Sequence, residues 1–350
     1  MTRLAYYVRD PGAANVVFAL HDALARGDGR LRSILMRHGL AAIPDTPIVW
    51  ARGPGRTTWQ QHGKTTPGPL PDELERSTSD TELRSLLHRH GIEMLVTGVS
   101  DADDDTTQRL WRAANACCIP CVAVMDDHDN IAARFALADG SVAAPAAILA
   151  VDVAMAQAIA KIVSVEIEIV GDLHADRLAR LGPVSADERG ALRRAWGVDS
   201  DAQVLLFASS CIQEMRGVRM SEVDELLALE RLDGKLASGW RPGPLADRPG
   251  DSLTLVVRPH PRDAAGKYEA WQRAAQTRNV ISRDGDARHA IAAADLVTGT
   301  SPAMLREAEA LGTPCLSVAP WGIADRPVET DLPMGARQLE FRAGAEHGGS

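Results

Sequence analysis

The strongest constraint on the fold is the alternation of near-continuous apolar runs with helical patterns along most of the chain. The apolar runs, which we expect to be strands, cover residues 4–8, 31–36, 92–99, 121–126, 146–152, 165–172, 203–210, 253–261, 279–282, 295–299 and 315–318. Strands that are apolar on both faces are typical of parallel sheets covered by helices on both sides. The pattern predicts an α/β protein built from two successive Rossmann-like domains that face a cleft.

The length of 350 residues suits two domains better than one. We expect an N-terminal domain over residues 1–180 and a C-terminal domain over 181–335, followed by a weakly patterned tail over 336–350. Residues 44–80 are rich in Pro, Gly and Thr, which predicts a long surface loop inserted in the first domain.

Composition excludes several classes of protein. The net charge of −9 and the lack of a basic run argue against a nucleic-acid partner. No uninterrupted apolar stretch is long enough to span a membrane, and the strand expected at 4–8 leaves no room for a signal peptide. Five cysteines, three of them clustered, do not form a disulfide framework. We therefore expect a cytoplasmic protein without a membrane partner; its oligomeric state is not encoded in any pattern.

The segment DLVTGTSPAMLREAEALGTPCLSV (295–318) predicts an anion site in the second domain. A strand ends at Gly299, and Ser301 followed by proline is a typical helix start. The backbone N–H groups of that start and the hydroxyls of Thr300 and Ser301 would lie at the carboxyl edge of the sheet, where ligands bind. Glu307 lies further along the helix and could bind a sugar hydroxyl. An ordinary strand–helix corner explains the same residues.

A second polar group follows the strand that ends in LVVRPHPRD (255–263). Arg258 and His260 alternate onto one face, and the two prolines stop the strand. Together with Arg262 they could neutralise a diphosphate, with arginine binding as a fork. A solvated basic loop is the alternative.

In the first domain, RDPGAANVVF (9–18) places Asp10 at a strand end and Gly12 at the turn into a helix. Asp10 could act as the base that deprotonates an acceptor. A turn-forming Asp-Pro-Gly explains it equally well. Asn15 either approaches a ligand or belongs to the helix surface.

A cluster of Asp126, Asp127, His128 and Asp129 follows another strand, within MDDHDN (125–130). It could supply a general base, a metal site or polar contacts to an acceptor. We favour Asp127 or His128 as a catalytic group on the acceptor side, with a solvated acidic loop as the alternative.

Two further patterns suggest chemistry but have structural explanations. The run DADDD (101–105) resembles the Asp-x-Asp of metal sites and phosphatases, but Asp104 and Asp105 are better explained as caps of the next helix. Cys118 and Cys121 have redox-motif spacing, yet no fourth zinc ligand or thioredoxin-like context accompanies them, so we expect core cysteines.

The second half resembles the nucleotide-binding domain of GT-B-fold glycosyltransferases and of the related UDP-N-acetylglucosamine 2-epimerases. That superfamily has a small-residue turn before a helix with a Glu, then Leu-Gly-x-Pro and an apolar strand, which residues 294–318 match throughout. The sequence RPHPR (258–262) resembles the His-Pro motif of bacterial capsule and teichoic-acid transferases. The first half matches more loosely, in strand order and in residues 121–135 and 169–178.

The corner VRDPGAAN (8–15) departs from this superfamily. It lacks both the Gly-Thr-Arg-Pro-Glu opening of the 2-epimerases and the Gly-rich opening of the lipid-linked N-acetylglucosamine transferases, so no close subfamily is indicated.

The resemblance implies a glycosyltransferase that moves a sugar from a nucleotide-diphosphate sugar, such as a UDP-sugar, to a small soluble acceptor in secondary metabolism. Arg258, His260, Thr300 and Ser301 would bind the diphosphate and Glu307 the ribose, while Asp10 or the group 126–128 would be the base. Because GT-B enzymes generally work without a metal, it implies no metal and no cofactor beyond the co-substrate.

Three alternatives remain open at this point. The first is a nucleotide-sugar 2-epimerase or hydrolase on the same scaffold, which would release UDP from the donor alone. The second is a noncatalytic nucleotide-sugar-binding protein. The third is a polymer phosphotransferase, although no basic amphipathic helix is present to dock at a membrane.

Overall fold

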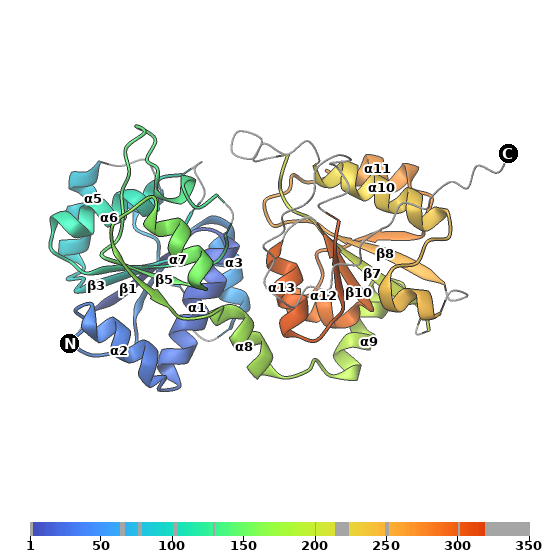
Figure 1. Cartoon of the computed structure of the whole chain (residues 1–350), viewed down its shortest axis with the longest axis horizontal. Helices are drawn as coiled ribbons and strands as arrows, with labels where there is room; N and C mark the ends of the chain where they lie inside the picture. The colour runs from blue at the N-terminus through green and yellow to red at the C-terminus, as the bar shows by residue number, and fades with distance from the viewer. Residues whose placement is uncertain are drawn as a thin grey trace. The chain divides into compact units, whose positions relative to one another are not determined.

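The structure, a computed structural model, describes residues 3–63, 67–75, 79–100, 104–128, 130–199, 201–213, 224–248, 252–299 and 302–318. Its contacts divide the chain into two compact units, one ending at Leu181 and the other beginning at Gly182. Each unit contains one parallel sheet with helices on both faces (Figure 1). The predicted fold class, an α/β protein with two Rossmann-like units, is confirmed. No helix among the described residues has the length and apolar character needed to cross a bilayer.

The first unit has a six-stranded sheet in the order β2-β1-β3-β4-β5-β6. Its strands are β1 (Leu4–Val8), β2 (Ile48–Ala51), β3 (Met94–Thr97), β4 (Cys121–Val124), β5 (Ala147–Ala150) and β6 (Glu166–Ile169). Neighbouring strands all pair in parallel. The order reverses between β1 and β3, and in open parallel sheets ligands bind outside the carboxyl ends of the strands at such a point.

The helices of this unit cover both faces of the sheet. They are α1 (Pro11–Ala25), α2 (Gly29–Arg37), α3 (Gly53–Gln61), α4 (Asp72–Glu75), α5 (Asp80–Arg89), α6 (Thr106–Ala116), the 3-10 helix η1 (Ala133–Phe135), α7 (Val153–Ala160) and α8 (Leu173–Leu181). Alternate side chains of β1 enter opposite cores: Tyr6 packs with α1, α2 and Trp59, and Tyr7 packs with α5 and α6. This two-sided burial explains why β1 is apolar at every position.

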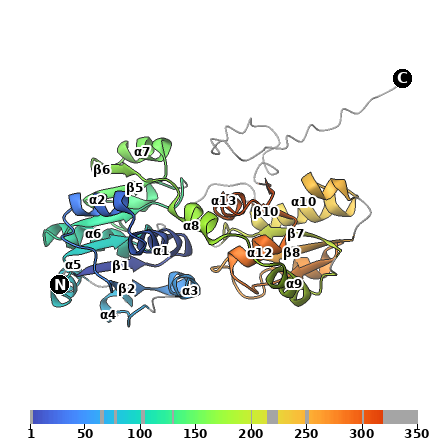
Figure 2. The ribbon, with the colours of Figure 1, turned by 90° about the horizontal axis from the view of Figure 1, so that it is seen from below.

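The second unit has a five-stranded parallel sheet in the order β11-β10-β7-β8-β9. The strands are β7 (Gln203–Ala208), β8 (Leu253–Arg258), β9 (Asn279–Ile281), β10 (Leu296–Gly299) and β11 (Cys315–Ser317). Helices α10 (Glu225–Ala237) and α11 (Glu269–Ala274) and the 3-10 helix η2 (Gly243–Asp247) cover one face, and α9 (Ala186–Ala195), α12 (Ala287–Ala293) and α13 (Pro302–Ala310) cover the other. Figure 2 shows α10 and α9 on opposite sides of β7 and β8. The order reverses between β7 and β10, which is the expected ligand position of this unit.

Two predictions about the secondary structure of the first unit are wrong. Residues 31–36 form part of helix α2 rather than a strand, because the Asp28 carboxylate caps the first turn and Leu31, Ile34 and Leu35 are buried at helical spacing. Residues 44–80 are not one irregular loop. They contain β2, α3 and α4, and β2, rather than 31–36, is the second strand of the chain and pairs with β1.

The switch point of the second unit requires a glycine at the end of β10. A Cβ atom on Gly299 would lie 2.5 Å from the backbone carbonyl oxygen of Ala208 on β7. Any larger residue must therefore push the two central strands apart at their carboxyl ends.

We predict that Gly299→Ala destabilises the protein by about 1–3 kcal/mol, because the added methyl group overpacks against backbone that pairs in the sheet. Gly234 in α10 is a matched control. It has open space at its Cβ position, so Gly234→Ala should instead stabilise by roughly 0.5–1 kcal/mol. Urea-induced unfolding of both variants measures the difference, and equal stability of the two variants would contradict the steric argument.

Candidate functional site

The carboxyl edge of the second sheet brings together the ends of β7, β8 and β10. Gly299 lies there, and its close approach to Ala208 accounts for the residue type; a role in binding stays a prediction. Glu307 lies half-buried on α13. Thr300 and Ser301 lie outside the described residues, so the predicted anion site at the start of α13 also stays a prediction.

Arg258 ends β8 and is held by the turn that follows β9. Its guanidinium donates to the carbonyl oxygens of Asp284 at 3.1 Å and Gly285 at 2.9 Å. Burial lowers the pKa of Arg258, while the nearby carboxylates of Asp286 and Glu307 act to raise it. Because the ordinary pKa of arginine is so high, the side chain remains a fixed cation at this edge. Arg258 and Glu307, which the sequence assigned to one site, therefore lie within electrostatic reach of each other.

His260 is held in one orientation by its own loop. Its Nδ1 accepts a hydrogen bond from the backbone N–H of Arg262 at 3.1 Å, and its backbone N–H donates to the Asp263 carboxylate at 2.7 Å. Arg283 donates to the carbonyl oxygen of His260 at 3.1 Å. With Nδ1 as acceptor, the neutral ring carries its proton on Nε2, which makes Nε2–H a donor suited to a phosphate oxygen. Arg262 thus acts on His260 through its backbone, which sequence patterns could not indicate.

A buried charge network supports this loop from beneath. The Lys267 ammonium contacts the carboxylates of Glu225 and Asp263, the latter at 2.7 Å. The side chain of Lys267 is 4% exposed, and both carboxylates are fully buried. The hydroxyl of Tyr268 also donates to Asp263, at 2.9 Å, and contacts Ser209 at the end of β7.

The same network holds the segment that follows β7. The Glu225 carboxylate accepts from the backbone N–H groups of Ile212 at 3.0 Å and Gln213 at 3.2 Å. Lys267 therefore ties the loop after β7 to the loop after β8, on the side of β7 away from β10. Sequence analysis missed Ser209, Glu225, Asp263 and Lys267, and no motif spacing would have joined them.

The first unit has a matching corner at its own switch point. A Cβ atom on Gly12 would lie 2.0 Å from Oδ2 of Asp126, so the Asp126 carboxylate occupies the space over the first turn of α1. Asp126 also forms an ion pair with Arg134. Gly12 is therefore explained by packing. The positive end of α1 is already next to a carboxylate, which makes Asp126 a structural anion more than a base.

Asp10 lies at the N-cap position of α1, but its side chain makes no capping hydrogen bond. Its carboxylate lies 3.6 Å from Arg9, and Arg9 in turn lies 3.3 Å from Asp104. Arg52 donates to the same Asp104 oxygen at 2.9 Å. The carboxyl edge of the first sheet thus carries an alternating set of charges from β1, β2 and the segment after β3. The role of Asp10 as a base stays a prediction.

His128 forms a hydrogen-bonded pair with Asp152, a residue that sequence analysis did not single out. Its Nε2 lies 2.9 Å from Oδ2 of Asp152, and the other Asp152 oxygen caps α7 through the N–H of Met155. Burial acts to raise the pKa of Asp152, but the bonds from Met155 and His128 outweigh it and lower the pKa. An ionised Asp152 at Nε2 orients the imidazole for proton transfer through Nδ1. Asp127, the residue before His128 in the chain, is buried. Asp129 lies outside the described residues.

The remaining predicted residues of the first unit have structural partners. The Asn15 amide oxygen accepts from Nε2 of His62 at 2.8 Å, which links α1 to the residue after α3. Asp104 caps α6 through the N–H of Thr106 as predicted. Asp105 makes no side-chain capping bond to α6, and its carboxylate accepts instead from the N–H of Ala138.

The prediction of core cysteines holds for one member of the pair. Cys121 is buried in β4, and burial raises the pKa of its thiol. Cys118 is exposed in a left-handed turn with φ of 54°, so the prediction is wrong for it.

Comparison with known proteins identifies the fold. No protein-family model and no curated protein sequence matches this chain. Among solved structures, the S. aureus MnaA–UDP complex has a TM-score of 0.59 at 12% identity, covering 92% of this chain and 82% of that one. The Methanocaldococcus jannaschii UDP-GlcNAc 2-epimerase with UDP-GlcNAc and UDP has a TM-score of 0.56 at 11% identity, covering 90% and 83%. A glycosyltransferase from Rickettsia africae has a TM-score of 0.52 at 11% identity, covering 90% and 79%.

These similarities confirm the predicted resemblance at the level of the fold. The chain has the GT-B-like fold that the 2-epimerase and glycosyltransferase structures share.

We predict that Lys267→Met lowers the free energy of unfolding by about 3–5 kcal/mol, because it leaves two buried carboxylates without their cation. Lys161 is the control: it is exposed after α7, and Lys161→Met should change stability by less than about 0.5 kcal/mol. Urea-induced unfolding followed by circular dichroism measures both. A Lys267→Met protein as stable as the parent would show that the network contributes little.

Proposed function

We propose that the protein is an enzyme that acts on a nucleotide-diphosphate sugar, with the diphosphate bound at the carboxyl edge of the second unit. The observation that carries the proposal is the rigid placement of Arg258 and His260 at the end of β8, next to the switch point. Both are donors fixed before any ligand arrives, which is the arrangement that stabilises charge developing on a leaving phosphate.

The two units differ in a way that supports this assignment. In the first unit the start of α1 is already next to the Asp126 carboxylate, so a phosphate there would meet like charge. In the second unit the side chains at the corresponding edge include Arg258, Arg283 and His260. Asp286 and Glu307 lie near Arg258 as well, but the fixed donors Arg258 and His260 favour the second unit for the diphosphate and leave the first for the sugar or the acceptor.

We favour sugar transfer to a small acceptor as the reaction. The acceptor hydroxyl or amine would lose its proton to His128, with Asp152 stabilising the imidazolium, and would attack the anomeric carbon as the diphosphate leaves. Arg258 and the Nε2–H of His260 would stabilise the leaving group. Asp10 is the second candidate base. The donor base, the sugar, independence from metal and a place in secondary metabolism belong to this proposal as further expectations.

A 2-epimerase or hydrolase reaction on the same donor is the second candidate. It is supported by the similarity of the fold to the M. jannaschii UDP-GlcNAc 2-epimerase, as the transferase is by the similarity to the R. africae glycosyltransferase. The corner VRDPGAAN argues against it, because it lacks the Gly-Thr-Arg-Pro-Glu opening of the resembling epimerases.

The donor site is tested by the affinity for UDP. Arg258→Lys keeps the charge but loses the fork of donors, so we expect UDP to bind about 10- to 100-fold more weakly. The exposed Arg273 on α11 is the control, and Arg273→Lys should bind UDP like the parent. Isothermal titration with UDP, GDP, CDP, TDP and ADP measures this. Failure of the parent protein to bind any of them would overturn the proposal, and equal affinity of the two variants would remove Arg258 from the site.

The reaction is tested by following UDP-GlcNAc with proton and phosphorus NMR, with and without a panel of alcohol and amine acceptors. UDP release that requires an acceptor identifies a transferase, and a 2-epimer or free UDP from the donor alone identifies an epimerase or hydrolase. In either case we expect His128→Gln to lower turnover about 10²- to 10⁴-fold with UDP affinity unchanged. His88→Gln, on the exposed face of α5, is the control. Full turnover by His128→Gln would show that His128 is not the base and would leave Asp10 as the candidate.

A further inference from the structure

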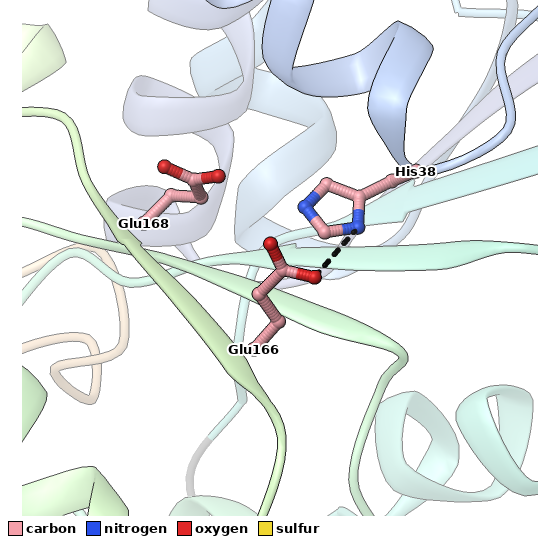
Figure 3. Close-up of side chains that lie close together, drawn as sticks. All are labelled: His38, Glu166 and Glu168. Atoms are coloured by element: carbon pink, nitrogen blue, oxygen red, sulfur yellow. Dashed lines mark ion pairs between the residues drawn. The ribbon is translucent and has the colours of Figure 1, made fainter.

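A cluster of potential metal ligands lies at the β6 edge of the first sheet (Figure 3). Glu166 and Glu168 are two residues apart on β6, and His38 follows the last turn of α2. One ligand atom from each residue lies within 4.8 Å of the others. Residues two apart on a strand share a face, so both carboxylates are presented together to the histidine. This cluster belongs neither to the switch point of the sheet nor to the His128–Asp152 dyad.

His38 has an unusual environment for a buried polar side chain. Its side chain is only 7% exposed, yet Nε2 is buried without a hydrogen-bond partner among the described residues. Nε2 has no polar partner there, and Nδ1 lies 3.9 Å from Oε2 of Glu166, which is beyond hydrogen-bond length. Figure 3 shows the edge of the ring that carries both nitrogens turned toward the two carboxylates. Burying the Nε2 atom without a partner costs free energy, which a group bound between the three side chains would recover.

We propose that His38, Glu166 and Glu168 bind a divalent transition-metal cation of the Zn²⁺ class. One imidazole nitrogen and two carboxylate oxygens form a ligand set that suits Zn²⁺, whereas Ca²⁺ and Mg²⁺ prefer oxygen alone. Ligand atoms at about 2.0–2.2 Å from a shared ion lie within ~4.4 Å of one another, so the cluster closes on an ion by a small rotation of its side chains. Water would complete the coordination.

The position of the cluster suggests that a bound ion would stabilise the fold. It would link the end of α2 to β6, and β6 is an edge strand whose outer backbone groups no further strand covers in the described sheet. The link would join segments that are far apart in the sequence, so cation binding should stabilise the folded first unit.

The guanidinium of Arg37 would compete with a metal ion for the Glu168 carboxylate. It forms an ion pair with Glu168, and the neighbouring Arg30 donates to the carbonyl oxygen of Ile169. A bound cation would have to displace or share the Arg37 interaction. Removal of Arg37 should therefore release Glu168 and tighten metal binding, an effect that a purely structural His–Glu contact would not produce.

The experiment is isothermal titration of the untagged full chain, stripped with EDTA, with ZnCl₂, MnCl₂ and CaCl₂ at pH 7.5. We expect one Zn²⁺ per chain, weaker Mn²⁺ binding and no Ca²⁺ binding. His38→Gln and Glu166→Gln should each weaken Zn²⁺ binding at least tenfold. Glu166 has a side chain that is 61% exposed, so its variant will fold even where His38→Gln does not. His88→Gln removes an exposed histidine outside the cluster and should bind like the parent.

Arg37→Ala should bind Zn²⁺ several-fold more tightly than the parent. Arg32→Ala removes an exposed charge from the same helix without a recorded contact to the cluster, and it should leave the affinity unchanged. Parental affinity in Glu166→Gln, an equal gain in both arginine variants, or no Zn²⁺ binding by the parent would each overturn the proposal.

Discussion

The candidate donor site depends on the ammonium group of Lys267, which lies buried between Glu225 and Asp263. Glu225 holds the backbone after β7, and Asp263 holds the backbone of His260 after β8. Without the cation the two carboxylates would repel each other in a medium of low dielectric. The network therefore sets the shape of two loops at once. The loop after β8, residues 259–263, is therefore held in place by the charge pairing beneath it as well as by its two prolines.

The first unit uses a different device at its equivalent corner. There the absence of a side chain at Gly12 lets the Asp126 carboxylate lie over the start of α1, where Arg134 and the helix dipole both stabilise it. A corner already satisfied in this way is poorly suited to a phosphate. The two units thus share a fold but differ at these corners, with the Asp126 carboxylate over the helix start in the first and the Arg258 guanidinium at the end of β8 in the second.

Sequence analysis found the residues at strand ends and missed their partners. Arg258, His260 and His128 follow apolar strands, and the end of a parallel strand marks the ligand edge of a sheet. Asp152 also follows an apolar strand, but sequence analysis did not single it out, and Lys267 carries no such signal. Each acts on a residue or loop that only the packing of separate elements brings near. The wrong strand at 31–36 has a similar origin, because a short apolar run does not distinguish a strand from one face of a helix.

The sequence by itself determined the class of the fold and the edge of each sheet that carries the polar groups, because burial on both faces and helix periodicity are local properties of the pattern. Only the tertiary structure decided the strand orders, and with them the switch points at β1–β3 and β7–β10. It also decided the pairings of His128 with Asp152, Lys267 with Glu225, and His38 with the glutamates of β6. The physical reason is that strand order and charge pairing depend on crossovers and contacts between distant segments, on which the local hydrophobic pattern carries no information.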